Sequence, residues 1–180
     1  VFCPQGKALG GGSAINAMIY IRGHRSDYDH WAALGNSGWG FDDLLPYFRK
    51  NESNERGGDA LHGDSGPLQV SDCRNYYRIN EHFLRAAEQA GYPRTDDFNG
   101  ERHEGVGFYQ FTIRDGRRCS ASHAYLRPAR SRANLTVKTG AMASRILFDG
   151  RRATGVEYRV KGQGERVTAR RETLVCGGAY

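Results

Sequence analysis

Apolar residues recur at a helical spacing in three stretches of the first half of the chain. The first covers residues 26–34 and predicts a short amphipathic helix capped by Ser26. A second helix is expected to begin near Asp42, where acidic residues suit the positive end of the helix dipole and Pro46 falls close to the first turn. The third ends at Gly91, a typical helix stop. The residues expected to face a core are Tyr28, Trp31, Ala32 and Leu34, then Leu44, Leu45, Tyr47 and Phe48, then Ile79, Phe83, Leu84, Ala87 and Ala90.

The segments around these helices have loop and strand patterns. Residues 51–64 are polar and contain glycine, which predicts an exposed loop. Alternating side-chain character predicts a strand at 67–70 and another over 107–114. Large side chains on both faces of the second strand indicate that it is buried or lines a cavity. A tight turn at 115–116 and a helix over 120–126, capped by Ser120 and followed by Pro128, are expected next.

From Asn134 onward the pattern is that of strands. The expected strands are 135–137, 145–148, 154–160 and 165–176, with hairpin connections at 149–150 and 162–164. Helices in the first part and strands in the last predict a mixed chain of the α/β (α+β) class.

The composition is that of a basic chain with a modest apolar content. Of its 180 residues, 38% are hydrophobic and 24 are glycine, and the formal net charge is +6. Such a composition is typical of a piece of a larger protein, because little apolar surface offsets the entropy cost of ordering. The arginines are scattered and no nucleic-acid-binding motif occurs, so we expect no nucleic acid partner. No apolar run approaches the roughly 20 residues of a membrane span.

Cysteine and histidine spacing gives no metal signature. The four cysteines lie far apart and the six histidines form no HExxH pattern, so no metal site is expected. The cysteines are interpreted as free thiols. His62 and His103 fall in expected loops and are interpreted as surface or packing residues.

The most distinctive stretch runs from Gly6 to Asn16 and contains three consecutive glycines followed by Ser13. Without Cβ atoms, the backbone N–H groups of such a run can approach a bulky anionic or planar ligand, and Ser13 stands where a helix N-cap would lie. A flexible glycine loop that enters an ordinary helix has the same pattern. The four letters GGGS therefore leave both interpretations open.

The residues around the glycines favour the ligand-contacting interpretation. They are Gly6, Lys7, Leu9, Gly10, Gly11, Ser13, Ile15, Asn16, Met18, Tyr20, Arg22, Gly23 and Asp27, continued by 35–36, 38–39, 45–48, 62–63, 66–67, 91–93, 96–100, 105–107, 116–118 and Ser120. In this order they resemble the glucose-methanol-choline (GMC) oxidoreductases, and within them the branch of flavoenzymes that act on choline and other alcohols. At Gly12 the family usually has serine, so the chain departs from the pattern there.

The resemblance implies an FAD site at the turn from Gly10 to Met18, which is named the glycine turn here. The cofactor-binding residues that it implies are Gly10, Gly11, Gly12, Ser13, Asn16, Ala17, Met18 and, through its main chain, Ala143. In some relatives a histidine at the position of Ile15 bonds to the flavin, which isoleucine cannot do, so non-covalent FAD is expected. No catalytic residue is expected, because none of the six histidines matches the family's catalytic base.

The implied fold is an α/β (α+β) fragment of an FAD/NAD(P)-binding-type flavoprotein with part of its substrate-binding domain. Residues 1–66 would belong to the FAD-binding domain, 67–133 to the substrate-binding domain, and 134–180 to a β-meander that returns to the FAD-binding domain. No GxGxxG unit occurs, and residues 173–179 resemble the strand and turn that lead into the family's second signature. The chain is therefore expected to be an internal fragment.

The function implied is that of a portion of an FAD-dependent oxidoreductase. It would oxidise the CH–OH group of choline or another primary alcohol by hydride transfer to flavin N5. The expected partners are that small alcohol and an electron acceptor, which is left open between a quinone and O₂. A cytoplasmic location is expected, with association with the inner face of a membrane as an option. The competing hypothesis is a catalytically inert remnant that serves as a nucleotide-binding or structural module, and the fragment alone is expected to be inactive.

Overall fold

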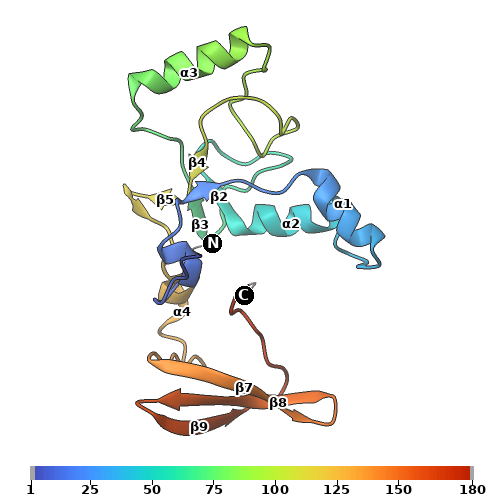
Figure 1. Cartoon of the computed structure of the whole chain (residues 1–180), viewed down its shortest axis with the longest axis vertical. Helices are drawn as coiled ribbons and strands as arrows, with labels where there is room; N and C mark the ends of the chain where they lie inside the picture. The colour runs from blue at the N-terminus through green and yellow to red at the C-terminus, as the bar shows by residue number, and fades with distance from the viewer. Residues whose placement is uncertain (1–2, 179–180) are drawn as a thin grey trace. The chain divides into compact units, whose positions relative to one another are not determined.

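The computed structural model describes residues 3–178 and divides into two compact units, Val1–Ser131 and Arg132–Tyr180 (Figure 1). Positions 1–2 and 179–180, which fall in the first and last of the expected segments, lie outside the described residues. The finer division into 1–66, 67–133 and 134–180 stays a prediction.

The first unit joins short helices to very short strands. In chain order it contains the 3-10 turn η1 (Gly11–Ala14), β1 (Ile19–Tyr20), α1 (Arg25–Ala33), α2 (Phe41–Asn51), β2 (Glu52–Asn54), β3 (Leu68–Val70), α3 (Arg78–Gln89), β4 (Gln110–Phe111), β5 (Ile113–Arg114), β6 (Arg117–Arg118), the π-helical η2 (Ser122–Leu126) and α4 (Arg127–Ala129). β1 pairs antiparallel with β4, β2 pairs parallel with β3, and β5 and β6 form a hairpin. The strands thus connect segments that are far apart in the sequence.

Helices α1 and α2 pack on each other through aromatic rings. Tyr28 is buried, and its ring centroid lies 6.0 Å from that of Phe41 and 5.4 Å from that of Phe48. The expected cap of α1 was wrong: the N-cap is His24, whose Nδ1 accepts a hydrogen bond from the backbone N–H of Ser26. An imidazole nitrogen thus replaces the expected hydroxyl as the acceptor for an unpaired N–H group of the first turn.

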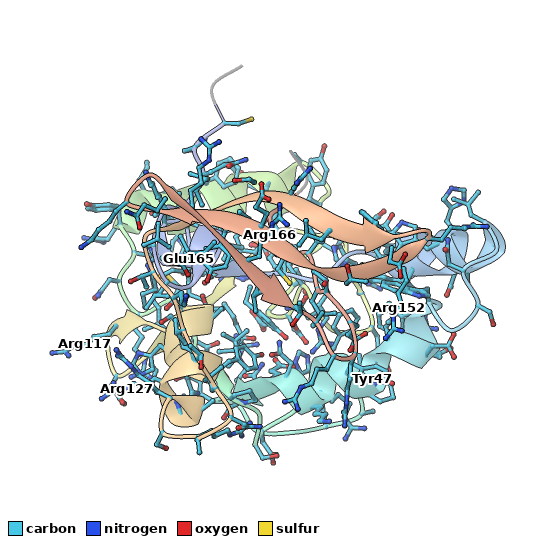
Figure 2. The ribbon with its side chains drawn as sticks, turned by 90° about the horizontal axis from the view of Figure 1, so that it is seen from below. Tyr47, Arg117, Arg127, Arg152, Glu165 and Arg166 are labelled. Atoms are coloured by element: carbon cyan, nitrogen blue, oxygen red, sulfur yellow. The ribbon has the colours of Figure 1, made fainter. Side chains whose placement is uncertain are left out.

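Three expected core positions in and next to these helices are exposed. Tyr47, labelled in Figure 2, is 67% exposed, although its neighbours Leu44, Leu45 and Phe48 are half-buried. Trp31 in α1 and Leu34, just after it, are also exposed. Helical period alone does not distinguish the edge of an apolar face from its centre, so all three positions were misassigned.

The segment 51–64, expected to be an exposed loop, is exposed over residues 55–60 but not at its buried polar positions. Its residues 52–54 form β2, and Glu52, Asn54 and His62 are buried. The prediction was wrong at these positions because polar composition indicates exposure only when the polar groups have no partners inside the protein.

Helix α3 is confirmed, and in Figure 1 it lies apart from α1 and α2. Among its expected core residues only Leu84 is buried, whereas Ile79 and Phe83 remain exposed. The periodicity therefore identified the helix, but the described residues cover little of its apolar face.

The expected strand 107–114 is divided into β4 and β5, which pair with different partners, β1 and β6. The turn at Asp115 and Gly116 is confirmed, with φ of 50° and 70°. Ser120 bonds to the N–H of His123 as a cap would. The helix does not stop before Pro128, which occupies the first turn of α4, where a missing N–H costs nothing.

The second unit is an antiparallel meander of β7 (Ala141–Asp149), β8 (Arg152–Val160) and β9 (Gln163–Thr168). The expected strand at 135–137 does not form, and the last strand ends at Thr168 rather than at 176. Lys138, which precedes the sheet, donates to Tyr158 and Glu165 over 2.6 and 2.7 Å. These two side-chain hydrogen bonds, rather than the backbone bonds of a strand, attach the segment before β7 to the sheet.

The predicted α/β (α+β) class is confirmed by this mixture of helices and strands. Within residues 3–178, no helix has the length and apolar character needed to cross a lipid bilayer.

Gly63→Ala should destabilise the first unit by about 3 kcal/mol or more, the cost of severe overpacking. A Cβ at Gly63 would lie 1.9 Å from the carbonyl oxygen of Arg49, and backbone cannot move aside cheaply. Gly12→Ala is the matched control, because a Cβ there meets no atom within 4 Å. Urea unfolding of both variants checks this, and equal stabilities would contradict it.

Candidate functional site

The glycine turn is a compact loop with left-handed backbone at its start. Gly10 has φ of 98° and Gly11 has φ of 53°, a region that favours glycine. The N–H of Gly11 donates to the carbonyl of Ala8, and that of Ser13 to the carbonyl of Gly10. Gly10, not Ser13, is the N-cap of η1, so the predicted capping role of Ser13 was wrong.

The turn leaves open space where a ligand could approach its backbone. A Cβ built on Gly11 or Gly12 would meet no atom within 4 Å. Among residues 3–178, the N–H groups of Gly12 and Ala17 donate no hydrogen bond to the protein. Two backbone donors, and the open space beside Gly11 and Gly12, are thus available to a ligand.

The side chain of Ser13 ties the turn to the rest of the first unit. Its Oγ donates to the carbonyl of Gly10 and accepts a 2.9 Å hydrogen bond from the N–H of Ala121. The expected contact of Ser13 with a cofactor stays a prediction; in the structure its hydroxyl already has two internal partners.

The side chain of Asn16 is also held from a distant part of the sequence. Its Oδ1 accepts hydrogen bonds from the N–H of Met18 at 3.1 Å and from Nη1 of Arg118 at 2.8 Å. Sequence reasoning missed Arg118, and the resemblance around 116–118 was the signal that could have singled it out. The far end of the turn is held through the carbonyl of Met18, which accepts from the N–H and Oγ1 of Thr112.

The structure brings seven of the expected site residues together, because Gly10, Gly11, Gly12, Ser13, Asn16, Ala17 and Met18 form one loop. Met18 has φ of 63°, unusual for a residue with a side chain. Ala143 belongs to the second unit, where it lies on β7 and pairs with Tyr158. β7 is the edge of the described sheet, so one side of its backbone has no strand partner.

A cavity of about 550 Å³ adjoins the end of the glycine turn. It is lined by Met18 and Phe111 together with the charged residues Glu55, Asp72 and Arg74. Phe111 was expected either to line a cavity or to pack in a core, and it lines this one. The charges are paired internally: Arg74 lies 2.6 Å from Glu55, and Arg56 lies 2.8 Å from Asp72.

A second polar cluster is buried behind the turn and centres on Glu52, which is 0% exposed. Its carboxylate accepts hydrogen bonds from the guanidinium of Arg22 and from Nδ2 of Asn54, and its Oε1 lies 3.0 Å from Nδ1 of His62. The other ring nitrogen of His62 lies 2.9 Å from Oδ2 of Asp97. Two basic groups and two carboxylates thus alternate in one chain of contacts.

Hydrogen bonds to Asp97 and Glu52 raise the pKa of His62 to about 9. Burial is the largest single effect on Asp97 and opposes its ionisation. The hydrogen bonds from His62 and from the N–H of Asn99, together with the positive charges of His62 and Arg56, outweigh it and lower the pKa of that carboxyl. At neutral pH His62 is therefore an imidazolium that donates from both nitrogens. It has no free nitrogen to accept a proton, so it serves packing, as expected for His62, and not base catalysis.

No group of three or more metal-ligating side chains occurs among the residues that the structure describes. The glycine turn is accordingly the candidate site, and the Glu52 cluster is its support.

Comparisons with known proteins show the family to which the chain belongs. The GMC oxidoreductase family model matches residues 1–180. Human mitochondrial choline dehydrogenase is 45% identical over 99% of this chain, and an oxygen-dependent choline dehydrogenase of Yersinia pestis (strain Pestoides F) is 50% identical over 98% of it. This chain spans 30% and 32% of those two proteins.

The solved structure of an FAD-dependent oxidoreductase from Chaetomium thermophilum has the same architecture. It superposes with a TM-score of 0.85 at 31% identity, covering 92% of this chain and 31% of its own.

The stability of the first unit should fall as the pH rises from 6.5 to about 9, the pKa values of histidine in the unfolded state and of His62 in the fold. Because the folded pKa is the higher one, the contribution is complete below pH 6.5 and lost above 9, with a size of up to about 3 kcal/mol. Urea unfolding across this range measures it. His62→Gln should remove the slope and His103→Gln should keep it; a flat wild-type profile would refute the prediction.

Proposed function

Because the chain belongs to the GMC oxidoreductase family, we propose that it supplies part of an FAD-dependent enzyme that oxidises the CH–OH group of an alcohol. The observation that carries this proposal is the glycine turn, whose open backbone edge has the form that a planar, anionic cofactor requires. Choline or another primary alcohol is the proposed substrate, because the curated relatives are named choline dehydrogenases. The chain spans about a third of their length, so the full activity also depends on residues beyond this segment.

The donors of the glycine turn fit FAD. The N–H groups of Gly12 and Ala17 lack acceptors among the described residues, and a pyrophosphate or a flavin carbonyl would provide them. Bound there, FAD would supply the flavin that accepts the hydride of the alcohol. Backbone donors held in place beforehand would stabilise the negative charge that develops on it without reorganisation, which would lower the barrier.

The proposed binding of FAD is non-covalent. The residue at the position of the flavin-linked histidine of some relatives is Ile15, and its hydrocarbon side chain can form no bond to the ring. The main chain of Ala143 is proposed to contact the adenine of FAD, as the sequence resemblance implies. Its place on the edge strand β7 supports this role, since an edge strand has backbone groups without a strand partner.

The electron acceptor is proposed to be a quinone or O₂. One relative is named as oxygen-dependent and another as mitochondrial, so the names favour neither acceptor nor a single compartment. The cytoplasmic location expected from the sequence remains a prediction.

FAD retention tests the cofactor assignment. The chain mixed with FAD and then gel-filtered should keep the visible absorbance of oxidised flavin. Gly11→Ala should weaken FAD binding about tenfold or more, because its Cβ would project from a left-handed backbone into the open edge. Gly12→Ala should bind normally, since the family usually has a side chain there. A colourless wild-type chain would favour the inert structural module.

A chimaera tests the reaction. Replacing the matching segment of the Yersinia pestis relative with this chain should give an enzyme that oxidises choline or another primary alcohol, as its 50% identity supports. Flavin reduction by the alcohol without O₂, followed by reoxidation with either O₂ or a quinone, identifies the acceptor. A folded, FAD-containing chimaera that no alcohol reduces would contradict the proposed reaction.

A further inference from the structure

We propose that Arg118 is a positioning residue of the FAD site, which fixes the glycine turn and turns the amide of Asn16 so that its N–H groups face the cofactor. This inference rests on the proposed function. Arg118 lies on β6, about a hundred residues after the turn, and is not among the residues that the family resemblance assigns to the cofactor.

A single nitrogen of Arg118 makes all of the contacts. Nη1 donates to the carbonyl oxygens of Ser13 and Asn16, at 3.2 and 2.7 Å, and to Oδ1 of Asn16 at 2.8 Å. A guanidinium stays charged at every accessible pH, so these charge-assisted bonds do not depend on a titration. The carbonyls in the middle of the turn are thereby directed toward Arg118.

The same contacts decide which way the Asn16 amide lies. Nη1 of Arg118 and the N–H of Met18 both contact the same terminal atom of the Asn16 side chain, and both are donors. That atom therefore has to be the amide oxygen. Nδ2 is the other atom of the amide, and it donates no hydrogen bond among residues 3–178. Its two N–H donors are thus available to a ligand, as is the N–H of Ala17, the next residue along the chain.

The backbone around Arg118 is held by hydrogen bonds within the first unit. Arg118 pairs with Ile113 in the β5–β6 hairpin, and the N–H of the next residue, the buried Cys119, donates to the carbonyl of Thr112 at 2.8 Å. Ala121 binds the side chain of Ser13, and Thr112 binds the carbonyl of Met18 at the end of the turn. Arg118 therefore holds the stretch from Ser13 to Asn16.

The neighbouring arginine provides a matched control. Arg117, labelled in Figure 2, precedes Arg118 on the same strand and is exposed, and no side-chain hydrogen bond or ion pair of it occurs within the described part of the chain. Removing its charge changes the net charge of the protein by the same amount as removing that of Arg118.

The experiment compares Arg118→Met, Arg118→Lys, Asn16→Asp and Arg117→Met in the full chain. Hydrogen exchange without FAD should show faster exchange of the glycine turn in Arg118→Met alone, with β7–β9 unchanged. FAD titration should show affinity reduced about tenfold or more in Arg118→Met, intermediate in Arg118→Lys, and within about twofold of the wild type in Arg117→Met.

Asn16→Asp separates positioning from folding. A carboxylate still accepts from Arg118 and Met18, so the turn should exchange as slowly as in the wild type, yet FAD affinity should fall at least about tenfold because the Nδ2 donors are gone. Normal FAD binding by Arg118→Met or by Asn16→Asp, in a wild-type background that binds FAD, overturns this inference and leaves the proposed function intact. A wild-type chain that binds no FAD overturns the proposed function itself.

Discussion

The first unit depends on one buried negative charge, the carboxylate of Glu52. An uncompensated carboxylate in the interior would be prohibitively costly, so its partners cannot be lost one at a time. Asn54 meets it from the same strand, His62 from ten residues further along and Arg22 from a distant segment, and His62 continues the contacts to Asp97. With few fully buried apolar side chains in the described residues, this charge pairing does much of what a hydrophobic core does in other folds.

The cluster also determines where the glycine turn lies. Only three residues separate Met18, at the end of the turn, from Arg22, whose backbone N–H bonds to Oδ1 of Asn99 and whose guanidinium bonds to Glu52. The opposite side of the turn is held by Thr112 and Arg118. A loop rich in glycine is thus made specific by its neighbours, which is how a flexible sequence can present donors in a fixed arrangement for a cofactor.

Local patterns predicted the elements whose causes are local. Helix α3 and the turn at Asp115–Gly116 follow from periodicity and from the backbone preferences of a few adjacent residues. Glu52, Asn54 and His62, within the expected loop 51–64, were misread for the complementary reason. They are buried because partners from positions 22, 97 and 110 reach them, and no local signal shows that those partners exist.

By itself, the sequence determined the family resemblance, the glycine turn and the FAD assignment that they support, since these depend on residue identities in a fixed order. Only the tertiary structure decided that Gly10 rather than Ser13 caps η1, that Ser13 and Asn16 are held by Ala121 and Arg118, and that Glu52 is buried. The physical reason is the distance along the chain. A hydrogen bond between residues a hundred positions apart depends on how the whole unit packs, and no local preference encodes it.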